Sequence, residues 1–242
     1  MTSTLPFIGL HYWAGAGWAF DGLAALLAPD HRLLAPDLPG FGAAPPLADA
    51  SVGAYTDHVA HFIASQHVRG YVLVGHSMGG KIALNLAARQ PPGLTGVVLL
   101  SPSPPGLEPL SETDRQAALS AYGQADEAEK TLHKITARPL PAAIQKQIVH
   151  DNLRSSRAAW DAWLRQGSRE DIRAGMHNIR VPCLVLVGDQ DPVLSPAVQR
   201  THTLPLLPAG TSLETIPGAG HLLPYEAPEA VAALLRAFGQ QL

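Results

Sequence analysis

Short apolar runs rich in β-branched residues alternate along this chain with longer stretches that mix apolar and polar residues. The apolar runs predict buried strands at residues 5–10, 32–36, 71–74, 96–100, 181–187 and 212–216. The mixed stretches predict helices at residues 18–27, 52–66, 80–89, 195–204 and 228–238. Strands that are apolar throughout and alternate with helices predict an α/β fold, in which helices cover both faces of a mostly parallel sheet.

The alternation stops between residues 102 and 178, where no strand-like run occurs. Four helical stretches are expected there, near residues 112–122, 126–136, 142–153 and 156–166. The composition also changes, since 11 of the 17 Lys and Arg residues lie between Arg115 and Arg180. We therefore expect residues 1–101 and 179–242 to form the core domain, and residues 102–178 to form a helical cap insertion over one end of the sheet.

Composition narrows the possible functions. The chain has 242 residues, of which 46% are hydrophobic and 15% charged, so it is globular and long enough for a sizeable core. A net charge of −3 gives no basic footprint for nucleic acid. The single cysteine, Cys183, lies in an apolar run and excludes a disulfide framework. Because the first residues lack the basic residues of a signal peptide and no apolar run is long enough to cross a membrane, we expect a cytoplasmic protein.

The most informative motif is Gly75-His76-Ser77-Met78-Gly79, which reads G-x-S-x-G between a predicted strand and a predicted helix. This context predicts a nucleophile elbow, in which a tight turn exposes the serine hydroxyl above a helix N-terminus. The segment from Gly75 to Lys81 also nearly fits a phosphate-binding loop. That loop requires Ser or Thr after the lysine, and this chain has Ile82. The sequence therefore favours a nucleophile elbow over a phosphate-binding loop.

A serine nucleophile needs a base and a group that orients the base. Of 11 histidines, His221 follows the last predicted strand in a glycine-rich loop, which places it at the same sheet edge as Ser77. Two acids, Asp189 and Asp191, follow the strand at 181–187. The chain order Ser, Asp, His is the order found in enzymes with this elbow.

Together these segments resemble the α/β-hydrolase superfamily over nearly the whole chain, with matches at residues 11–13, 37–42, 75–80, 188–193 and 218–221. The resemblance implies that Asp191 is the triad acid, with Asp189 a turn residue or polar neighbour, and that no cofactor or metal is needed. It also implies an oxyanion hole made by the backbone N–H groups of Trp13 and Met78. The family loop normally reads His-Gly where this chain has His11-Tyr12, so Tyr12 either contacts substrate or packs.

Other residues have weaker patterns. Trp160 and Trp163 lie at helical spacing and either line an acyl pocket or pack against the core. His58 and His61 are three apart on a helix, where a solvated face is favoured over a metal site. Residues 130–173 contain nine basic and four acidic side chains, which form a solvated surface or favour an anionic substrate or an acyl-carrier partner.

The resulting hypothesis is a serine hydrolase that cleaves small carboxylic esters through a Ser77–His221–Asp191 triad and an acyl-enzyme. Three alternatives stay open. One is a C–C bond hydrolase of the meta-cleavage type, although those enzymes commonly have Trp where this chain has Leu222. The second is a lyase similar to the menaquinone-pathway enzyme, which binds carboxylates through basic groups. The third is a binding protein on the hydrolase fold without catalytic activity.

Overall fold

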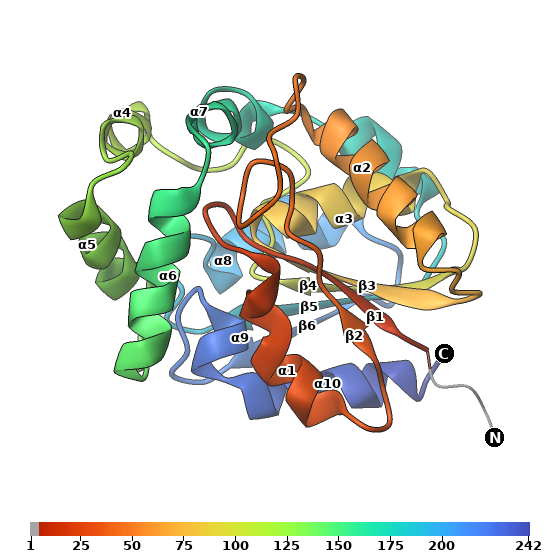
Figure 1. Ribbon diagram of the computed structural model, residues 1–242. Helices are drawn as coiled ribbons and strands as arrows, with labels where there is room; N and C mark the ends of the chain where they lie inside the picture. The colour runs from red at the N-terminus through yellow and green to blue at the C-terminus, as the bar shows by residue number, and fades with distance from the viewer. Residues whose placement is uncertain (1–4) are drawn as a thin grey trace.

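One parallel sheet of six strands, in the order β2-β1-β3-β4-β5-β6, runs through the computed structural model, which describes residues 5–242 (Figure 1). The strands are β1 (Phe7–Leu10), β2 (Leu33–Leu34), β3 (Tyr71–His76), β4 (Leu94–Leu100), β5 (Cys183–Gly188) and β6 (Ser212–Ile216). Every strand pair is parallel, which confirms the predicted α/β class. The absence of a signal peptide was predicted from residues that lie mainly outside the described range.

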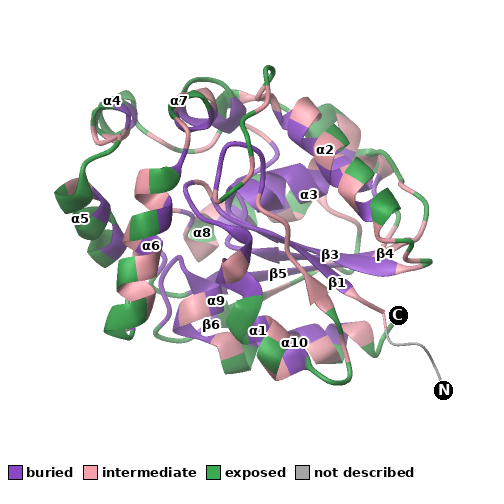
Figure 2. Cartoon of the chain, in the orientation of Figure 1, coloured by how far each residue is buried: buried purple, intermediate pink, exposed green. Residues whose placement is uncertain are grey.

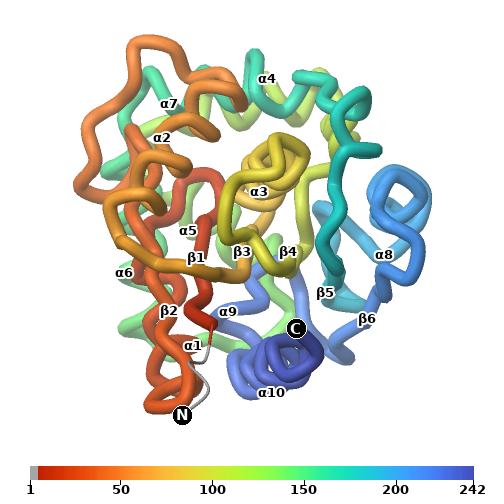
Figure 3. Tube along the Cα trace, turned by 90° about the vertical axis from the view of Figure 1, so that its right-hand side faces the viewer, coloured from red at the N-terminus to blue at the C-terminus, as the bar shows by residue number. Residues whose placement is uncertain are grey.

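Helices cover the sheet on both faces (Figures 1 and 3). On one face lie α2 (Val52–Ser65) and α3 (Met78–Ala88), and on the other α1 (Asp21–Leu27) and α10 (Pro228–Gly239), with the short α9 (Leu223–Glu226) nearby. Each face of the sheet packs against its helices in a hydrophobic core, and the side chains of β3 point alternately to the two faces. Val72 and Val74 pack on the side of α1 and α10, while Leu73 packs on the side of α2 and α3. Strands β3 and β5 are accordingly buried throughout, and β4 is buried from Gly96 to Leu100 (Figure 2).

Two predicted elements differ from the structure. Strand β2 covers only two residues because it lies at the sheet edge and Pro36 ends the run without an N–H to donate. The helix predicted at 195–204 is present, but it is irregular and extends to residue 206. The chain there forms α8 (Pro196–Val198), a π-helical stretch at Gln199–Thr203 and a 3-10 turn at Leu204–Leu206. Pro205 lacks the N–H that would continue an α-helix, which accounts for the final turn.

Residues 102–178 contain α4 (Glu112–Ser120), α5 (Ala125–Ile135), α6 (Ala142–Arg154) and α7 (Arg157–Arg165), then 3-10 turns at Gly167–Arg169 and Arg173–Asn178. Helices α4–α7 gather at one end of the sheet (Figure 1). The Ser156 N–H donates to the Gly40 carbonyl at 2.7 Å, and the His221 N–H donates to the Ile135 carbonyl at 2.8 Å. Because Gly40 and His221 follow β2 and β6, these helices contact the carboxyl edge of the sheet.

Within residues 5–242, no helix combines the length and the apolar character that crossing a membrane requires.

Candidate active site

Ser77 alone makes the turn between β3, which ends at His76, and α3, which begins at Met78. Its backbone is strained, with φ at 52° and ψ at −116°. Two glycines make the turn possible by close approach. A Cβ on Gly79 would lie 2.1 Å from the Leu10 carbonyl oxygen, and one on Gly75 would lie 2.6 Å from the Gly79 carbonyl oxygen. The elbow therefore requires glycine at both positions.

The same turn leaves no phosphate-binding loop, because a single residue separates strand from helix. Lys81, which completed the P-loop pattern, is buried and donates from Nζ to the Gly106 carbonyl at 2.8 Å. Burial lowers the pKa of this lysine to about 8. Lys81 thus anchors the segment after β4 and does not project into an open loop.

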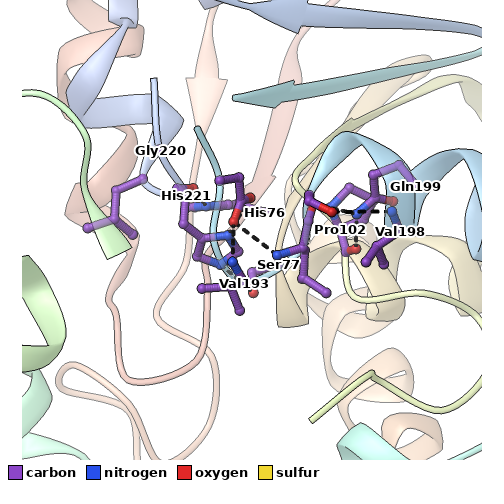
Figure 4. Close-up of polar contacts among 12 residues, drawn as sticks. His76, Ser77, Pro102, Val193, Val198, Gln199, Gly220 and His221 are labelled. Atoms are coloured by element: carbon purple, nitrogen blue, oxygen red, sulfur yellow. Dashed lines mark hydrogen bonds and ion pairs between the residues drawn. The ribbon is translucent and has the colours of Figure 1, made fainter. Parts of the chain in front are cut away.

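The structure brings Ser77, His221 and Asp191 together from three separate turns and loops. Figure 4 shows Ser77 beside His221. The Ser77 Oγ lies 3.0 Å from His221 Nε2, and His221 Nδ1 lies 2.8 Å from Asp191 Oδ2. This geometry fits a histidine that donates its Nδ1–H to the carboxylate and accepts from the serine hydroxyl at Nε2. All three side chains are nearly enclosed, with Ser77 9% and His221 4% exposed.

The charges of the pair reinforce this arrangement. Burial opposes protonation of His221, but the charge and hydrogen bond of Asp191 outweigh it and raise the histidine pKa above its ordinary value. Burial likewise opposes ionisation of Asp191, yet the His221 charge and hydrogen bonds lower the pKa of this carboxyl. Asp191 therefore ionises at lower pH than an ordinary aspartate, and His221 takes up a proton at higher pH than an ordinary histidine.

Backbone donors fix the orientation of the Asp191 carboxylate. Its Oδ1 accepts from the N–H groups of Val193 at 2.8 Å and Leu194 at 2.9 Å. The buried Gln199 amide donates to the carbonyls of Pro102 at 2.9 Å and Leu194 at 3.3 Å, which ties the segments after β4 and β5 together (Figure 4). The irregular helix at residue 199 thus supports the loop that holds the acid.

Asp189 occupies a different place. It is exposed, and its Oδ1 accepts from the Gly218 N–H at 2.7 Å. The acid beside His221 is therefore Asp191, as the family pattern implied, while Asp189 connects the same two loops from outside.

The two backbone donors that the family resemblance implied for an oxyanion hole are free of other partners. Across the described part of the chain, neither the Trp13 N–H nor the Met78 N–H donates a hydrogen bond. His11 fixes the first of these loops, because its Nδ1 donates to the Tyr12 carbonyl at 2.7 Å and its Nε2 accepts from the Leu38 N–H at 2.9 Å. Burial lowers the pKa of His11 to about 4, so the ring stays neutral. Two free donors of this kind suit an oxyanion.

His76, the second residue of the elbow motif, makes a contact that the motif does not predict. Its Nε2 lies 2.8 Å from the His221 carbonyl oxygen and donates to it (Figure 4). Burial lowers the pKa of His76 to about 3, so it acts as a neutral donor. No spacing rule signals this contact, because it is made to a backbone carbonyl 145 residues away.

The aromatic candidates lie in packed positions. The Tyr12 ring is buried between His76 and Tyr225, with ring centroids 5.1 and 6.4 Å away. Trp160 packs on Trp13, with centroids 4.1 Å apart, and donates its indole N–H to the Ala118 carbonyl. Trp163 instead belongs to the core beneath α2 and α3. Direct substrate contact by any of the three stays a prediction.

Most of the basic side chains between residues 130 and 173 have local partners. Six of them form ion pairs with nearby carboxylates: Lys130, Arg154, Arg157, Arg165, Arg169 and Arg173. Arg138 donates to the carbonyls of Pro217, Gly218 and Glu226. By contrast, the charges that raise the His221 pKa come from carboxylates. Most of the positive charge between residues 130 and 173 is therefore already engaged by protein groups.

No group of three or more His, Cys, Asp or Glu side chains within residues 5–242 is arranged to hold a metal ion. His58 and His61 lie along α2, where the charge of His61 adds to burial in lowering the pKa of His58.

Comparison with known proteins places the chain in a family. A model described as the alpha/beta hydrolase family matches residues 8–234. The chain is 29% identical over 239 residues to a 2-succinyl-6-hydroxy-2,4-cyclohexadiene-1-carboxylate synthase from Enterobacter sp. (strain 638), covering 93% of this chain and 88% of that protein. It is 27% identical over 200 residues to a pimeloyl-[acyl-carrier protein] methyl ester esterase from Nitrosomonas europaea, covering 78% and 77%.

Among solved structures, an esterase from Exiguobacterium antarcticum matches with a TM-score of 0.88 at 19% identity, over 99% of this chain and 93% of that one, which shows a shared fold. The family model spans most of the chain, including Ser77, Asp191 and His221. The chain belongs to the alpha/beta hydrolase family.

Proposed function

We propose that this protein is a serine esterase that hydrolyses small carboxylic esters. The observation that carries the proposal is the continuous contact from Ser77 Oγ through the His221 imidazole to the Asp191 carboxylate, at 3.0 and 2.8 Å. The free N–H groups of Trp13 and Met78 support it, because acyl transfer develops negative charge on the carbonyl oxygen. Similarity to a methyl ester esterase agrees with this reaction class.

In the proposed mechanism, Ser77 attacks the ester carbonyl while His221 Nε2 takes the hydroxyl proton. The two backbone N–H groups stabilise the tetrahedral oxyanion, an effect worth about 3 kcal/mol for each donor. His221 then gives the proton to the departing alcohol. Water, deprotonated by His221, releases the acid and restores Ser77. Asp191 holds the imidazole in the required tautomer throughout.

We also propose that residues 102–178 act as a cap whose inner surface selects the substrate. Helix α7 contacts the loop after β1 through the Trp13–Trp160 ring contact. The last residue of α5, Ile135, accepts a hydrogen bond from the His221 N–H. A series of esters of graded acyl length, assayed with the wild-type protein and with Trp160→Ala, tests this role. The cap proposal requires the variant to change the preferred acyl length and not only the overall rate.

The direct test of the function is labelling by a fluorophosphonate probe followed by assays on 4-nitrophenyl esters. The expected result is stoichiometric labelling at Ser77, found by peptide mass spectrometry, together with turnover of at least one ester. Intact protein that resists the probe and hydrolyses no ester in the panel would refute the esterase proposal.

A second candidate is a lyase, favoured by the 29% identity to the cyclohexadiene-carboxylate synthase over nearly the full length of both chains. A molecule of the kind in that synthase's name carries carboxylate groups. The charges that act on His221 here are also negative, so they would repel such a molecule. This argues for the esterase. Elimination activity on a carboxylated cyclohexene substrate, measured by ultraviolet absorbance and exceeding ester turnover, would reverse the order of the two candidates.

The pH profile gives a quantitative prediction. His221 must be neutral to accept the serine proton, so activity is present above its pKa and lost as the pH falls through it. Because Asp191 holds that pKa above the ordinary value, we expect kcat/KM to rise through a single midpoint above about 6.5 and then level off. Rates measured from pH 5 to 9 check this. A flat profile over that range contradicts a histidine base.

Charge selectivity is expected to be small, because six basic side chains of the cap segment are already paired with carboxylates. A neutral ester and an isosteric ester with a distal carboxylate should therefore differ in kcat/KM by less than about threefold at low ionic strength. Adding salt to about 0.5 M should change this ratio little, because salt can only weaken an electrostatic attraction and little attraction is expected here. A strong preference for the anionic ester that disappears with salt would show that the cap attracts anions.

A further inference from the structure

The carboxylate of Glu226 accepts hydrogen bonds from four backbone N–H groups. Its Oε2 accepts from Ala137 at 2.7 Å, Arg138 at 3.0 Å and Gly220 at 2.9 Å, and its Oε1 accepts from Leu222 at 2.9 Å. The side chain is only 5% exposed. A carboxylate buried in this way is stabilised by its donors, and each donor is in turn kept from being buried without a partner.

These four donors come from two segments far apart in the sequence. Gly220 and Leu222 flank His221, while Ala137 and Arg138 follow α5 in residues 102–178. Between them, the His221 N–H donates to the Ile135 carbonyl at 2.8 Å. Three successive N–H groups, at 220, 221 and 222, are therefore all held by Glu226 or by the end of α5. The fit is tight, because a Cβ on Gly220 would lie 2.7 Å from the Ile135 carbonyl oxygen.

Arg138 strengthens the same connection. Its guanidinium donates to the carbonyls of Pro217, Gly218 and Glu226, at 2.6, 3.1 and 2.9 Å. On the other side of the loop, His76 donates to the His221 carbonyl. The backbone of His221 is thus fixed at both its N–H and its C=O, independently of the contacts that its imidazole makes.

We propose that Glu226 is a positioning residue for His221, and that it does this by fastening residues 135–138 to the loop 220–222. This Glu226 clamp makes the end of α5 a fixed part of the catalytic framework. The inference rests on the proposed role of His221 as the base. It extends that role, because it predicts that a change in the cap segment alters proton transfer and not merely substrate access.

The clamp also adds charge beside the imidazole. The charged and titratable groups acting on His221 are Asp191, Glu108, Glu226 and the neutral His76. Asp191 dominates, and Glu226 adds a smaller effect that raises the histidine pKa further. Removing the Glu226 charge should therefore lower the pH midpoint of activity, a change that loss of packing alone does not produce.

The main test is Glu226→Gln, with Glu229→Gln as the matched control. Glutamine keeps the shape but turns one acceptor into an NH2 group, which faces a backbone donor and cannot bond it. We expect kcat to fall about 10- to 100-fold while KM changes less than about threefold, because the nucleophile and base lose their alignment. The acid midpoint of kcat/KM should move to lower pH. Glu229 is exposed in the first turn of α10, and its variant should match wild type.

A second variant, Arg138→Met, loosens the cap segment without removing the Glu226 charge. It should lower kcat with KM preserved, but without moving the acid midpoint to lower pH. It also keeps the test decisive if Glu226→Gln proves unable to fold, as judged by thermal unfolding. Wild-type kcat and pH profiles in both folded variants, or wild-type values in Arg138→Met alone when the other does not fold, would overturn the clamp.

Two measurements separate failure of the clamp from failure of the esterase proposal. NMR titration of the His221 imidazole and hydrogen exchange of the 220–222 amides need no substrate. The clamp predicts a lower imidazole pKa in Glu226→Gln and faster amide exchange in both variants. If wild-type protein hydrolyses no ester but these changes occur, the clamp stands and the reaction assignment fails. Unchanged titration and exchange refute the clamp whatever the activity.

Discussion

Ser77→Ala is expected to abolish ester hydrolysis, with kcat lower by several orders of magnitude, while the protein stays folded. The hydroxyl makes no backbone hydrogen bond that holds the turn, and alanine tolerates the φ of 52° about as well as serine does. Triad members act as a unit, so loss of the nucleophile removes nearly all the rate that the triad supplies. Steady-state assays and thermal unfolding of the purified variant measure both halves of this prediction.

Ser103→Ala is the matched control. Ser103 is buried beside the elbow and donates its backbone N–H to the Ser77 carbonyl at 2.9 Å, an interaction that alanine retains. This variant should keep most of the wild-type rate. If Ser77→Ala retained more than about a tenth of wild-type activity, above what loss of a triad member permits, another residue would be the nucleophile.

The elbow was predictable because its requirements are local. A strand, a single turn residue and a helix follow one another in sequence, and glycine is required where a Cβ would lie only 2.1 to 2.6 Å from a backbone oxygen. His221 was predictable for a related reason, since a loop after a parallel strand lies at the carboxyl edge. Periodicity alone did not separate Asp191 from Asp189. Family resemblance chose Asp191, and only the structure gives the physical reason, which is that Asp189 turns outward to Gly218.

The supporting contacts were not predictable, because they join side chains to backbone atoms of distant segments. Glu226 contacts residues 137 and 138, and His76 contacts the His221 carbonyl, across 88, 89 and 145 residues of sequence. The basic surplus of residues 130–173 illustrates the same limit. Arg169 pairs with Glu112, outside that window, so a local count of charges overstated the positive field.

The choice between the two aspartates yields the other large expected effect. Asp191→Asn should lower kcat on the order of 10⁴-fold. The carboxylate has one oxygen committed to the N–H groups of Val193 and Leu194. The asparagine carbonyl must therefore stay at that position, which turns its NH2 group toward His221. The imidazole then has to accept at Nδ1 and carry its proton on Nε2, where it can no longer take the proton of Ser77.

Asp189→Asn is the natural comparison, because the same atoms change at a site two residues away. Its carbonyl oxygen can still accept from the Gly218 N–H, so the loop should keep its shape and kcat should fall by less than about tenfold. Measuring kcat and KM for both variants on one ester decides the assignment. The argument from the Val193 and Leu194 donors requires a gap of at least about 100-fold between them. Equal losses, or a larger loss from Asp189→Asn, would mean that Asp189 carries the orienting role.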